Sequence, residues 1–224
     1  MPQLRYTSLR YLSFVCWMMV ILVCVPLAPA WSAVYPGSAS ATNPRWATPV
    51  DKTFNLYRMQ PDLYRSALPG AVQQGELQRL RIATVINFYQ RSDAEWLSDP
   101  NIRQIHQPLH ADRMDDADVL QALRSIRSAQ ADGAVLIHCK HGQNRTGMIA
   151  AMYRIVYQGW SKQQAIDEMR EGGFGGRERF EDAERYLQQV DLARFLSALN
   201  SGACSTSPWA YCALKEKVLN AFNG

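Results

Sequence analysis

The sequence predicts an α/β domain in which a central, mostly parallel β-sheet is flanked by helices. Two observations support this prediction. Short apolar runs rich in β-branched residues, such as 82–88 and 134–137, are typical of strands that are buried on both faces. These runs alternate along the chain with segments of helical periodicity, which is the pattern of a layered α/β domain. The chain has 224 residues, 47% of them hydrophobic, which suffices for one such domain with appendages.

Residues 1–30 have the features of a secretory signal peptide. Two arginines precede an uncharged apolar run at 12–28, and a small-residue cleavage site, Ala-Pro-Ala, follows at 28–30. An uncleaved membrane anchor is the alternative, because the apolar run is nearly long enough to span a bilayer. The positive N-terminus stays inside in either case, so the rest of the chain is exported. We therefore expect an exported protein, which in a bacterium would be periplasmic, with a secreted or membrane-anchored protein as the alternatives.

The segment that follows the leader, 31–53, is rich in Ala, Ser, Pro and Thr and has no clear period. We interpret it as a linker or a docked arm. A folded catalytic domain is expected over 54–200, and a C-terminal helical extension over 201–224. The formal net charge of +4 is mild and is not concentrated in a run, so the sequence predicts no nucleic-acid partner.

The expected strands carry alternating or continuous apolar residues, and the first two are joined by a turn at Pro61-Asp62. They are 55–59, 63–66, 82–88, 102–109 and 134–137. The expected helices carry apolar residues at helical spacing, and one starts with the capping box Ser161-x-x-Gln164. They are 74–80, 116–131, 145–157, 161–170, 180–199 and 208–222, with a polar helical turn over 91–97. The glycine-rich stretch 172–176 is expected to be a flexible loop.

The stretch 134–147 combines a buried strand, a tight loop and the start of a helix. Gly142 lies where the loop must turn, and glycine tolerates the positive φ that such turns need. Loop amides that point inward, together with the helix dipole, form a cradle for an anion. The same field favours the thiolate of Cys139, which we therefore predict to be a nucleophile. Arg145 can bind two phosphate oxygens with its planar fork, and Thr146 can donate its hydroxyl to the thiolate.

The motif His138-Cys139-x5-Arg145-Thr146 resembles the signature loop of the cysteine-dependent protein tyrosine phosphatase superfamily. The resemblance covers about 56–199 and looks closest to exported bacterial dual-specificity phosphatases. It implies hydrolysis of phosphomonoesters through a cysteinyl-phosphate intermediate, without a metal or another cofactor, and a supporting role for His138. The residues that it implies for phosphate binding are Lys140, His141, Gly142, Gln143, Asn144 and Arg145.

A second motif, Leu-Tyr-Arg-Ser-x-x-Pro at 63–69, is similar to an N-terminal signature of the small dual-specificity phosphatases, especially the atypical bacterial, plant and fungal group. In that group the arginine and the serine brace the phosphate loop from below. The resemblance therefore implies a supporting role for Arg65 and Ser66. The alternative is an ordinary strand end with a surface arginine.

A phosphatase of this kind needs a proton donor for the leaving oxygen. The resemblance implies an aspartate on a loop about 25 to 35 residues before the cysteine, following a strand. The loop after 102–109 carries four candidates, and Asp112 follows the strand end most closely. Asp115 and Asp116 could instead cap the next helix, because aspartate is favoured at the N-cap and in the first turn. We therefore predict Asp112 as the general acid, with a solvated acidic loop as the alternative for all four.

Three cysteines follow the leader, and two of them can pair in an oxidising compartment. Cys204 and Cys212 are close in sequence and far from Cys139, so we expect a disulfide between these two. Two free, buried thiols are the alternative.

The resemblance implies a phosphotyrosine protein as the substrate, with phosphoserine or phosphothreonine as a further specificity. The periplasmic part of a membrane signalling protein is one candidate partner, and membrane contact is expected only through an uncleaved leader. A phosphoinositide or inositol polyphosphate phosphatase is the first alternative. Its relatives often carry lysines on both sides of the loop glycine, whereas this sequence has Lys140 but Gln143.

Three other functions fit this loop less well than a phosphatase does: a sulfurtransferase, a module that only binds phosphate, and a zinc site. A rhodanese-type sulfurtransferase has a loop one residue shorter, and a module that only binds phosphate would have lost Cys139 or Arg145. A zinc site at His138, Cys139 and His141 is a poor fit, because these residues are nearly adjacent and no second ligand cluster supports them. The remaining alternative for Cys139 is a buried structural cysteine, which is the commonest role of an isolated Cys.

Overall fold

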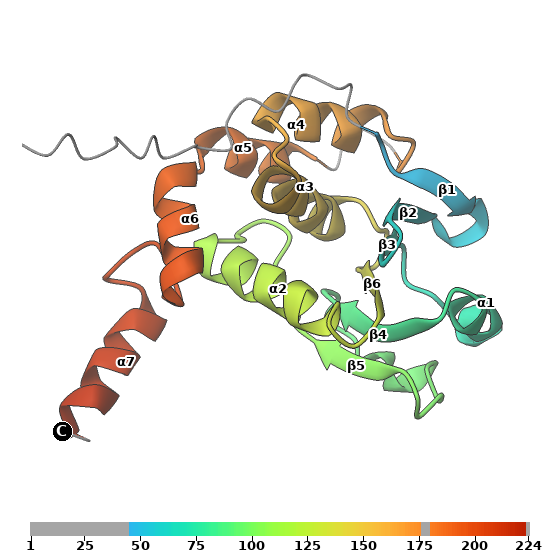
Figure 1. Cartoon of the computed structure of the whole chain (residues 1–224), viewed down its shortest axis with the longest axis horizontal. Coiled ribbons are helices and arrows are strands. Elements are labelled where there is room, and N and C mark those ends of the chain that lie inside the picture. The colour runs from blue at the N-terminus through green and yellow to red at the C-terminus, as the bar shows by residue number, and fades with distance from the viewer. Residues whose placement is uncertain (1–44, 176–179, 223–224) are drawn as a thin grey trace, which may run out of the picture. The chain divides into compact units, whose positions relative to one another are not determined.

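The computed structural model describes residues 45–175 and 180–222 (Figure 1). The signal peptide expected at 1–30, and the arm expected at 31–53 as far as residue 44, lie outside these residues. Within the described ranges no helix has both the length and the apolar character needed to cross a membrane.

A sheet of six strands, in the order β1-β2-β3-β6-β4-β5, forms the centre of the domain. Its strands are β1 (Thr48–Asp51), β2 (Leu56–Gln60), β3 (Leu63–Ser66), β4 (Ile82–Asn87), β5 (Arg103–His106) and β6 (Ala134–His138). The first two pairs are antiparallel and the other three are parallel, which confirms the predicted fold class. Ser66 of β3 and Asn87 of β4 both lie beside His138, so the loop after β6 starts between two neighbouring strand ends.

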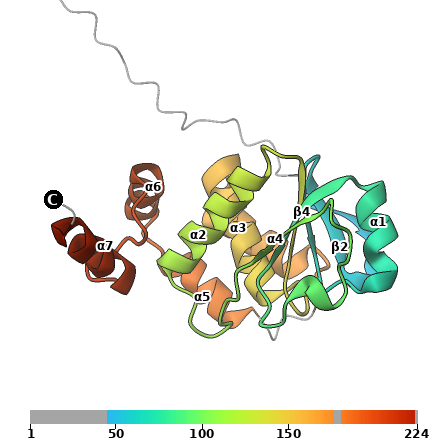
Figure 2. The same ribbon diagram turned by 90° about the horizontal axis from the view of Figure 1, so that it is seen from below.

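Helices cover both faces of this sheet. They are α1 (Gln74–Arg79), α2 (Asp116–Ala129), α3 (Asn144–Gln158), α4 (Lys162–Glu171), α5 (Glu181–Gln189), α6 (Leu192–Ser201) and α7 (Tyr211–Phe222). Alternate residues of β6 face opposite sides: Val135 and Ile137 join the larger core with α2 and α3, whereas Leu136 joins the smaller core with α1. Figures 1 and 2 show α1 across the sheet from α2 and α3.

The folded domain starts before the boundary expected at Phe54. β1 pairs with β2, and Ala47 is buried with its amide donating to Glu168 Oε1 at 2.6 Å. That carboxylate is also bound by Arg154, whose Nε and Nη2 donate to it at 2.9 and 2.6 Å. The described part of the expected arm is therefore an edge strand anchored in the core. Its short, irregular sequence carries no period that would have indicated a strand.

The single helix expected over 180–199 is in fact two. α5 ends at Gln189, its C-cap Val190 has an extended ψ of 128°, and α6 starts after Asp191. The Asp191 carboxylate accepts hydrogen bonds from the amides of Ala193 and Arg194, both at 3.1 Å. The apolar periodicity continues across the break, and for that reason it concealed an N-cap that favours a new helix start. The capping box expected at Ser161 and Gln164 is confirmed.

Candidate active site

Cys139 directly follows β6 and is the free cysteine of the described residues, with 2% of its surface exposed. The phosphate loop, residues 139–145, turns at Gly142, whose φ is +70°. A Cβ on this residue would lie 2.5 Å from the carbonyl oxygen of Ser66. Positive φ and this close backbone approach together require glycine at the position. The loop is therefore packed directly against the end of β3.

Three successive carbonyls of the phosphate loop are bound by groups that lie outside it. The oxygen of Lys140 accepts from the Leu68 amide at 3.3 Å, and that of His141 accepts from Asn55 Nδ2 at 3.1 Å. The oxygen of Gly142 accepts from Arg65 Nη2 at 2.8 Å. In a trans peptide the carbonyl and the following amide point in opposite directions. The next amides therefore turn toward the other side of the loop, as an anion-binding nest requires.

Arg65 lies under the phosphate loop and is 2% exposed. Its guanidinium stacks 3.6 Å from the centre of the Phe174 ring, a favourable cation–π contact. Burial lowers the pKa of Arg65 to about 10, against the opposing effect of the negative charges of Glu168 and Cys139. The side chain thus stays cationic at neutral pH. Ser66 is fully buried beside it; its hydroxyl donates to the Ala67 carbonyl, and its own carbonyl lies close to Gly142 of the loop.

The glycine-rich segment expected to be a flexible loop is packed, as far as the structure describes it, over 172–175. Phe174 is 2% exposed and contacts Tyr57 edge-on at 4.7 Å between ring centres. The carbonyl of Phe174 accepts from Asn55 Nδ2 at 2.9 Å, and that of Gly173 accepts from the Tyr57 hydroxyl at 2.8 Å. One asparagine amide thus joins this segment to the phosphate loop. The buried aromatic ring is the physical reason why the expectation of flexibility was wrong here.

His138 is fully buried and its Nε2 lies 2.8 Å from Asp93 Oδ2. Asp93 is also buried, and its Oδ1 accepts from Asn87 Nδ2 and Trp96 Nε1, both at 2.9 Å. The histidine is thus fixed to a short helical turn at 93–95 that follows β4. Its side chain therefore points away from solvent and is bound by Asp93, while its supporting role for the loop stays a prediction. Asp93 was not identified from the sequence, although Ser92 before it is a recognisable N-cap.

The start of α3 carries polar atoms that are buried and have no partner among the described residues. They are Gln143 Oε1, Asn144 Oδ1, Arg145 Nε and Thr146 Oγ1. The hydrogen bonds of Arg145 are long: Nη1 donates to the carbonyls of Phe88 at 3.4 Å and Leu109 at 3.5 Å, and the guanidinium lies 5.4 Å from the centre of the Tyr89 ring. Buried polar groups are nearly always hydrogen-bonded, so this cluster at the end of an amide cradle is suited to binding a polar ligand.

The other predicted loop residues differ in exposure. Lys140 and His141 have exposed side chains, in contrast to the buried Gly142. The Gln143 side chain lies against Gly175, where a Cβ would be 1.7 Å from its Nε2. Glycine at 175 therefore leaves the room that the Gln143 amide occupies.

The four candidate acids differ in their contacts. Asp112 and Asp115 lie in the acid loop, residues 107–115, and Asp116 and Asp118 lie in the first turn of α2. Asp115 is the N-cap of α2, and its carboxylate accepts from the Asp118 amide at 3.0 Å, while the Asp118 carboxylate accepts from the Asp115 amide at 3.3 Å. Burial raises the pKa of Asp118. Asp116 accepts from the hydroxyls of Tyr186 and Thr206. Asp112 is exposed and makes no hydrogen bond or ion pair with any part of the chain that the structure describes.

Asp112 also lines a cavity of about 160 Å³, together with Met148 of α3 and Arg185 of α5. Of the four acids it is thus the one whose carboxyl group makes no bond within the described residues. Elsewhere, Cys204 and Cys212 are joined by a disulfide, the pair that their spacing suggested. In the described ranges no three His, Cys, Asp or Glu side chains are grouped so as to hold a metal ion.

A buried free cysteine after the central strand, an amide cradle and an arginine at the helix start define a cysteine-dependent phosphatase. The model of the dual specificity phosphatase catalytic domain matches residues 63–190, and the chain belongs to this family. It is 47% identical over 186 residues to the dual specificity protein phosphatase TpbA of Pseudomonas aeruginosa (strain UCBPP-PA14), which covers 83% of this chain and 85% of the relative.

Two further comparisons bear on the site. A crystal structure of a Cys-to-Ser variant of P. aeruginosa TpbA in complex with pTyr is 49% identical and has a TM-score of 0.69. It covers 72% of this chain and 99% of that chain. Inositol diphosphatase DSP5 of Arabidopsis thaliana is 26% identical over 157 residues, which cover 66% of this chain and 74% of the relative.

Proposed function

We propose that this dual specificity phosphatase hydrolyses phosphotyrosine, and also phosphoserine or phosphothreonine, in proteins outside the cytoplasm. The observation that carries the proposal is the set of unpaired buried polar atoms on Arg145 and Thr146 beside the buried Cys139. These groups need a ligand that accepts hydrogen bonds from Arg145 and tolerates a thiolate in contact. A phosphoryl group meets both conditions, because its oxygens accept and its phosphorus is the electrophile.

In the proposed mechanism the thiolate of Cys139 attacks phosphorus, the S–P bond forms and the bond to the leaving oxygen breaks. Asp112 donates its proton to that oxygen. Water then attacks the cysteinyl-phosphate, Asp112 accepts a proton from it, and inorganic phosphate leaves with the thiolate restored. The loop amides and Arg145 stabilise the negative charge on the phosphoryl oxygens throughout, which is usually the largest catalytic contribution. Thr146 stabilises the thiolate as it is released.

Phosphotyrosine is favoured over inositol phosphates for two reasons. A relative 49% identical is described in complex with pTyr, whereas the inositol diphosphatase relative is 26% identical. The second reason is local: Gln143 occupies the position where phosphoinositide and inositol pyrophosphate phosphatases carry a second lysine. A neutral amide adds less to the binding of a densely charged inositol polyphosphate than a lysine does.

The substrate class is tested by phosphate release from a phosphotyrosine peptide, a phosphothreonine peptide and inositol hexakisphosphate at matched concentrations, with a metal chelator present. The phosphotyrosine peptide should give the highest kcat/KM, and the Cys139→Ser variant should give no release from any of them. A higher kcat/KM for the inositol phosphate would contradict the proposed substrate and favour an inositol phosphatase.

Export is proposed on two supports. The features of residues 1–30 are those of a secretory leader, and a disulfide such as Cys204–Cys212 persists mainly in oxidising compartments. An alkaline phosphatase reporter fused after residue 44 should be active only if the leader is exported, because that reporter needs oxidising conditions. The same fusion without residues 1–30 is the control. A phosphorylated periplasmic part of a membrane signalling protein is the proposed partner, and the Cys139→Ser variant should retain it in its phosphorylated form only.

A further inference from the structure

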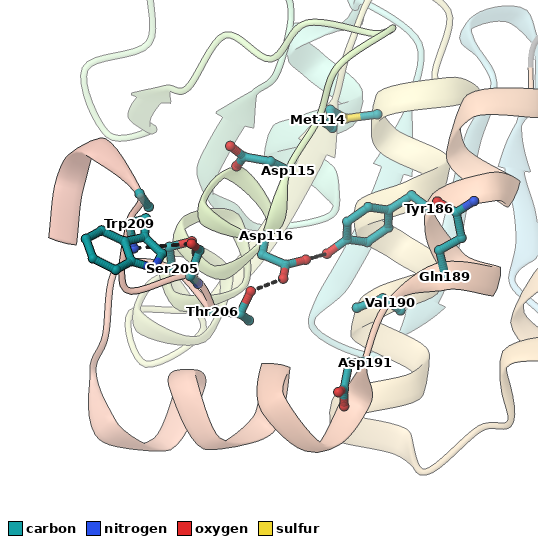
Figure 3. Close-up of a pocket in the computed structure, with 12 residues that line it drawn as sticks. Met114, Asp115, Asp116, Tyr186, Gln189, Val190, Asp191, Ser205, Thr206 and Trp209 are labelled. Atoms are coloured by element: carbon teal, nitrogen blue, oxygen red, sulfur yellow. Dashed lines mark hydrogen bonds between the residues drawn. The ribbon is translucent and has the colours of Figure 1, made fainter. Parts of the chain in front are cut away.

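The first residue of α2 is held by two hydroxyl groups that come from different parts of the chain. The carboxylate of Asp116 accepts from the Tyr186 hydroxyl of α5 at 2.7 Å and from the Thr206 hydroxyl of the C-terminal segment (Figure 3). Burial and this bond to Asp116 raise the pKa of Tyr186, so its hydroxyl stays protonated and remains a donor. One carboxylate therefore links α2, α5 and the chain beyond α6.

Asp116 lines a large cavity. A cavity of about 540 Å³ lies between the start of α2, the end of α5 and the segment 205–210. Figure 3 shows Asp116 between Tyr186 and Thr206 in this cavity, with Met114 and Asp115 also on its wall. Close packing cannot fix the start of α2 on this side, because there are few atoms to pack against. The two hydroxyl bonds are thus the direct connections that hold it there.

The C-terminal segment is itself anchored, so Thr206 is a fixed donor. The disulfide between Cys204 and Cys212 closes a short loop around it. At the other end of this segment, Arg124 of α2 donates through Nη2 to the carbonyls of Ala198 at 2.9 Å and Ala203 at 2.8 Å. This segment lies beyond residues 63–190, which match the family model. It therefore adds a contact to α2 from outside the matched catalytic domain.

We propose that Asp116 is a positioning residue for the general acid, and that the disulfide-closed loop 204–212 completes its support. Only three residues separate Asp112 from Asp116, so the position of the first turn of α2 limits where the Asp112 carboxyl group can lie. Without the bond from Thr206 or Tyr186 this turn loosens, and the acid is less often in reach of the leaving oxygen. Small displacements of a catalytic group cost much of its rate contribution. The proposal rests on the function proposed above.

The test uses Thr206→Val and Tyr186→Phe, which remove one donor each and leave the Asp116 charge in place. For each we expect kcat on phosphotyrosine peptide to fall about three- to tenfold with little change in KM, because proton donation is impaired and binding is not. On p-nitrophenyl phosphate, whose leaving group needs little protonation, kcat should stay within about twofold. The basic limb of the pH–rate profile should persist, because Asp112 is still present.

The disulfide is tested by the double variant Cys204→Ser/Cys212→Ser, which avoids reductants that would also act on Cys139. It should show the same selective loss on phosphotyrosine peptide. Thr206→Ser, which keeps the hydroxyl, should restore the rate, and Trp209→Phe, an exposed residue of the same loop, is the matched control. Thermal melts identify any variant that fails to fold.

Two results would overturn the proposal: unchanged rates on both substrates for folded Thr206→Val and Tyr186→Phe, or an equal loss on both substrates. Failure of the underlying function is distinguishable from these. It would appear as a wild-type protein that releases no phosphate from phosphotyrosine peptide, or as a Cys139→Ser variant that retains activity.

Discussion

The phosphate loop and the acid loop take part in one proposed reaction but are supported in different ways. Side chains and amides from distant segments bind the carbonyls of the phosphate loop, with Asn55 and Arg65 among the donors. The acid loop is fixed at its start by backbone bonds, such as that from the Leu109 amide to Phe88, and at its end by the Asp115 cap. Between these points Asp112 is exposed. Stabilisation of charge requires prearranged dipoles, whereas a proton donor needs access to a substrate atom that differs between substrates.

The largest effect is expected from Cys139→Ser, which tests whether Cys139 of the phosphate loop is the nucleophile. The cradle and Arg145 survive the change, but a hydroxyl is a far weaker nucleophile at neutral pH than a thiolate. We expect kcat to fall by at least about 10³-fold, with phosphorylated peptide still bound. Turnover is measured by phosphate release, and binding by calorimetry. Residual activity within about tenfold of the wild type would contradict the assignment of the nucleophile.

Arg145→Lys keeps the positive charge at the end of the phosphate loop and removes the planar fork. A point ammonium cannot bind two phosphoryl oxygens at once, so we expect kcat/KM to fall by about 10²- to 10³-fold. Steady-state kinetics on phosphotyrosine peptide measure the loss. Near-normal kcat with lysine would show that charge alone suffices and that the bidentate role is wrong.

Asp112→Asn tests the acid loop, and its effect should depend on the leaving group. The phenol of tyrosine has a pKa of about 10, so it leaves with difficulty as a bare anion, whereas nitrophenolate leaves readily. We expect a loss of about 10²-fold in kcat on phosphotyrosine peptide, a smaller loss on p-nitrophenyl phosphate, and loss of the basic limb of the pH–rate profile.

Asp115→Asn is the matched control for this change, because asparagine is as good an N-cap as aspartate. It should leave both substrates nearly unaffected. If Asp115→Asn or Asp116→Asn showed the leaving-group dependence and Asp112→Asn did not, the acid would be misassigned while the cysteine mechanism stood.

The smallest effect is expected from Asn55→Gly, which tests how much the side-chain amide of Asn55 contributes to holding the phosphate loop in place. Asn55 has a φ of +58°, and glycine tolerates this conformation, so the change removes the amide without adding backbone strain. Loss of the bonds to His141 and Phe174 should weaken competitive inhibition by inorganic phosphate by about three- to tenfold. An unchanged inhibition constant would mean that Arg65 and the Leu68 amide hold the loop sufficiently without it.

The sequence predicted the residues that lie in two continuous motifs, the remote Arg65 among them, and missed those that lie in neither motif. Cys139, Gly142 and Arg145 lie within seven positions, so their geometry follows from a strand, a turn and a helix start. By contrast, Asn55 bonds His141 across 86 positions, and Asp93 bonds His138 across 45. No local period encodes such a pairing. It becomes visible only when the strand order places the ends of β3 and β4 on either side of β6.

The buried Phe174 was missed for a related reason. A single aromatic residue among glycines has no apolar neighbours in the sequence, and its partners Tyr57 and Arg65 come from the neighbouring strands β2 and β3. The break at Asp191 was missed because apolar spacing dominated the interpretation of the segment. In both cases a local signal was present, but its consequence depended on the tertiary packing around it.

The edge strand β1 has a consequence for how the domain meets other copies of itself. It pairs with β2, so the backbone groups on that side of β2 are satisfied within the chain. A chain shortened to start at Phe54 would leave them unpaired, and would also remove the Ala47 amide from the buried Glu168 carboxylate. Exposed strand edges are templates for intermolecular sheet formation. With β1 in place, the exposed edge of the sheet is a strand of only four residues with an irregular register, which is a poorer template for such pairing than β2.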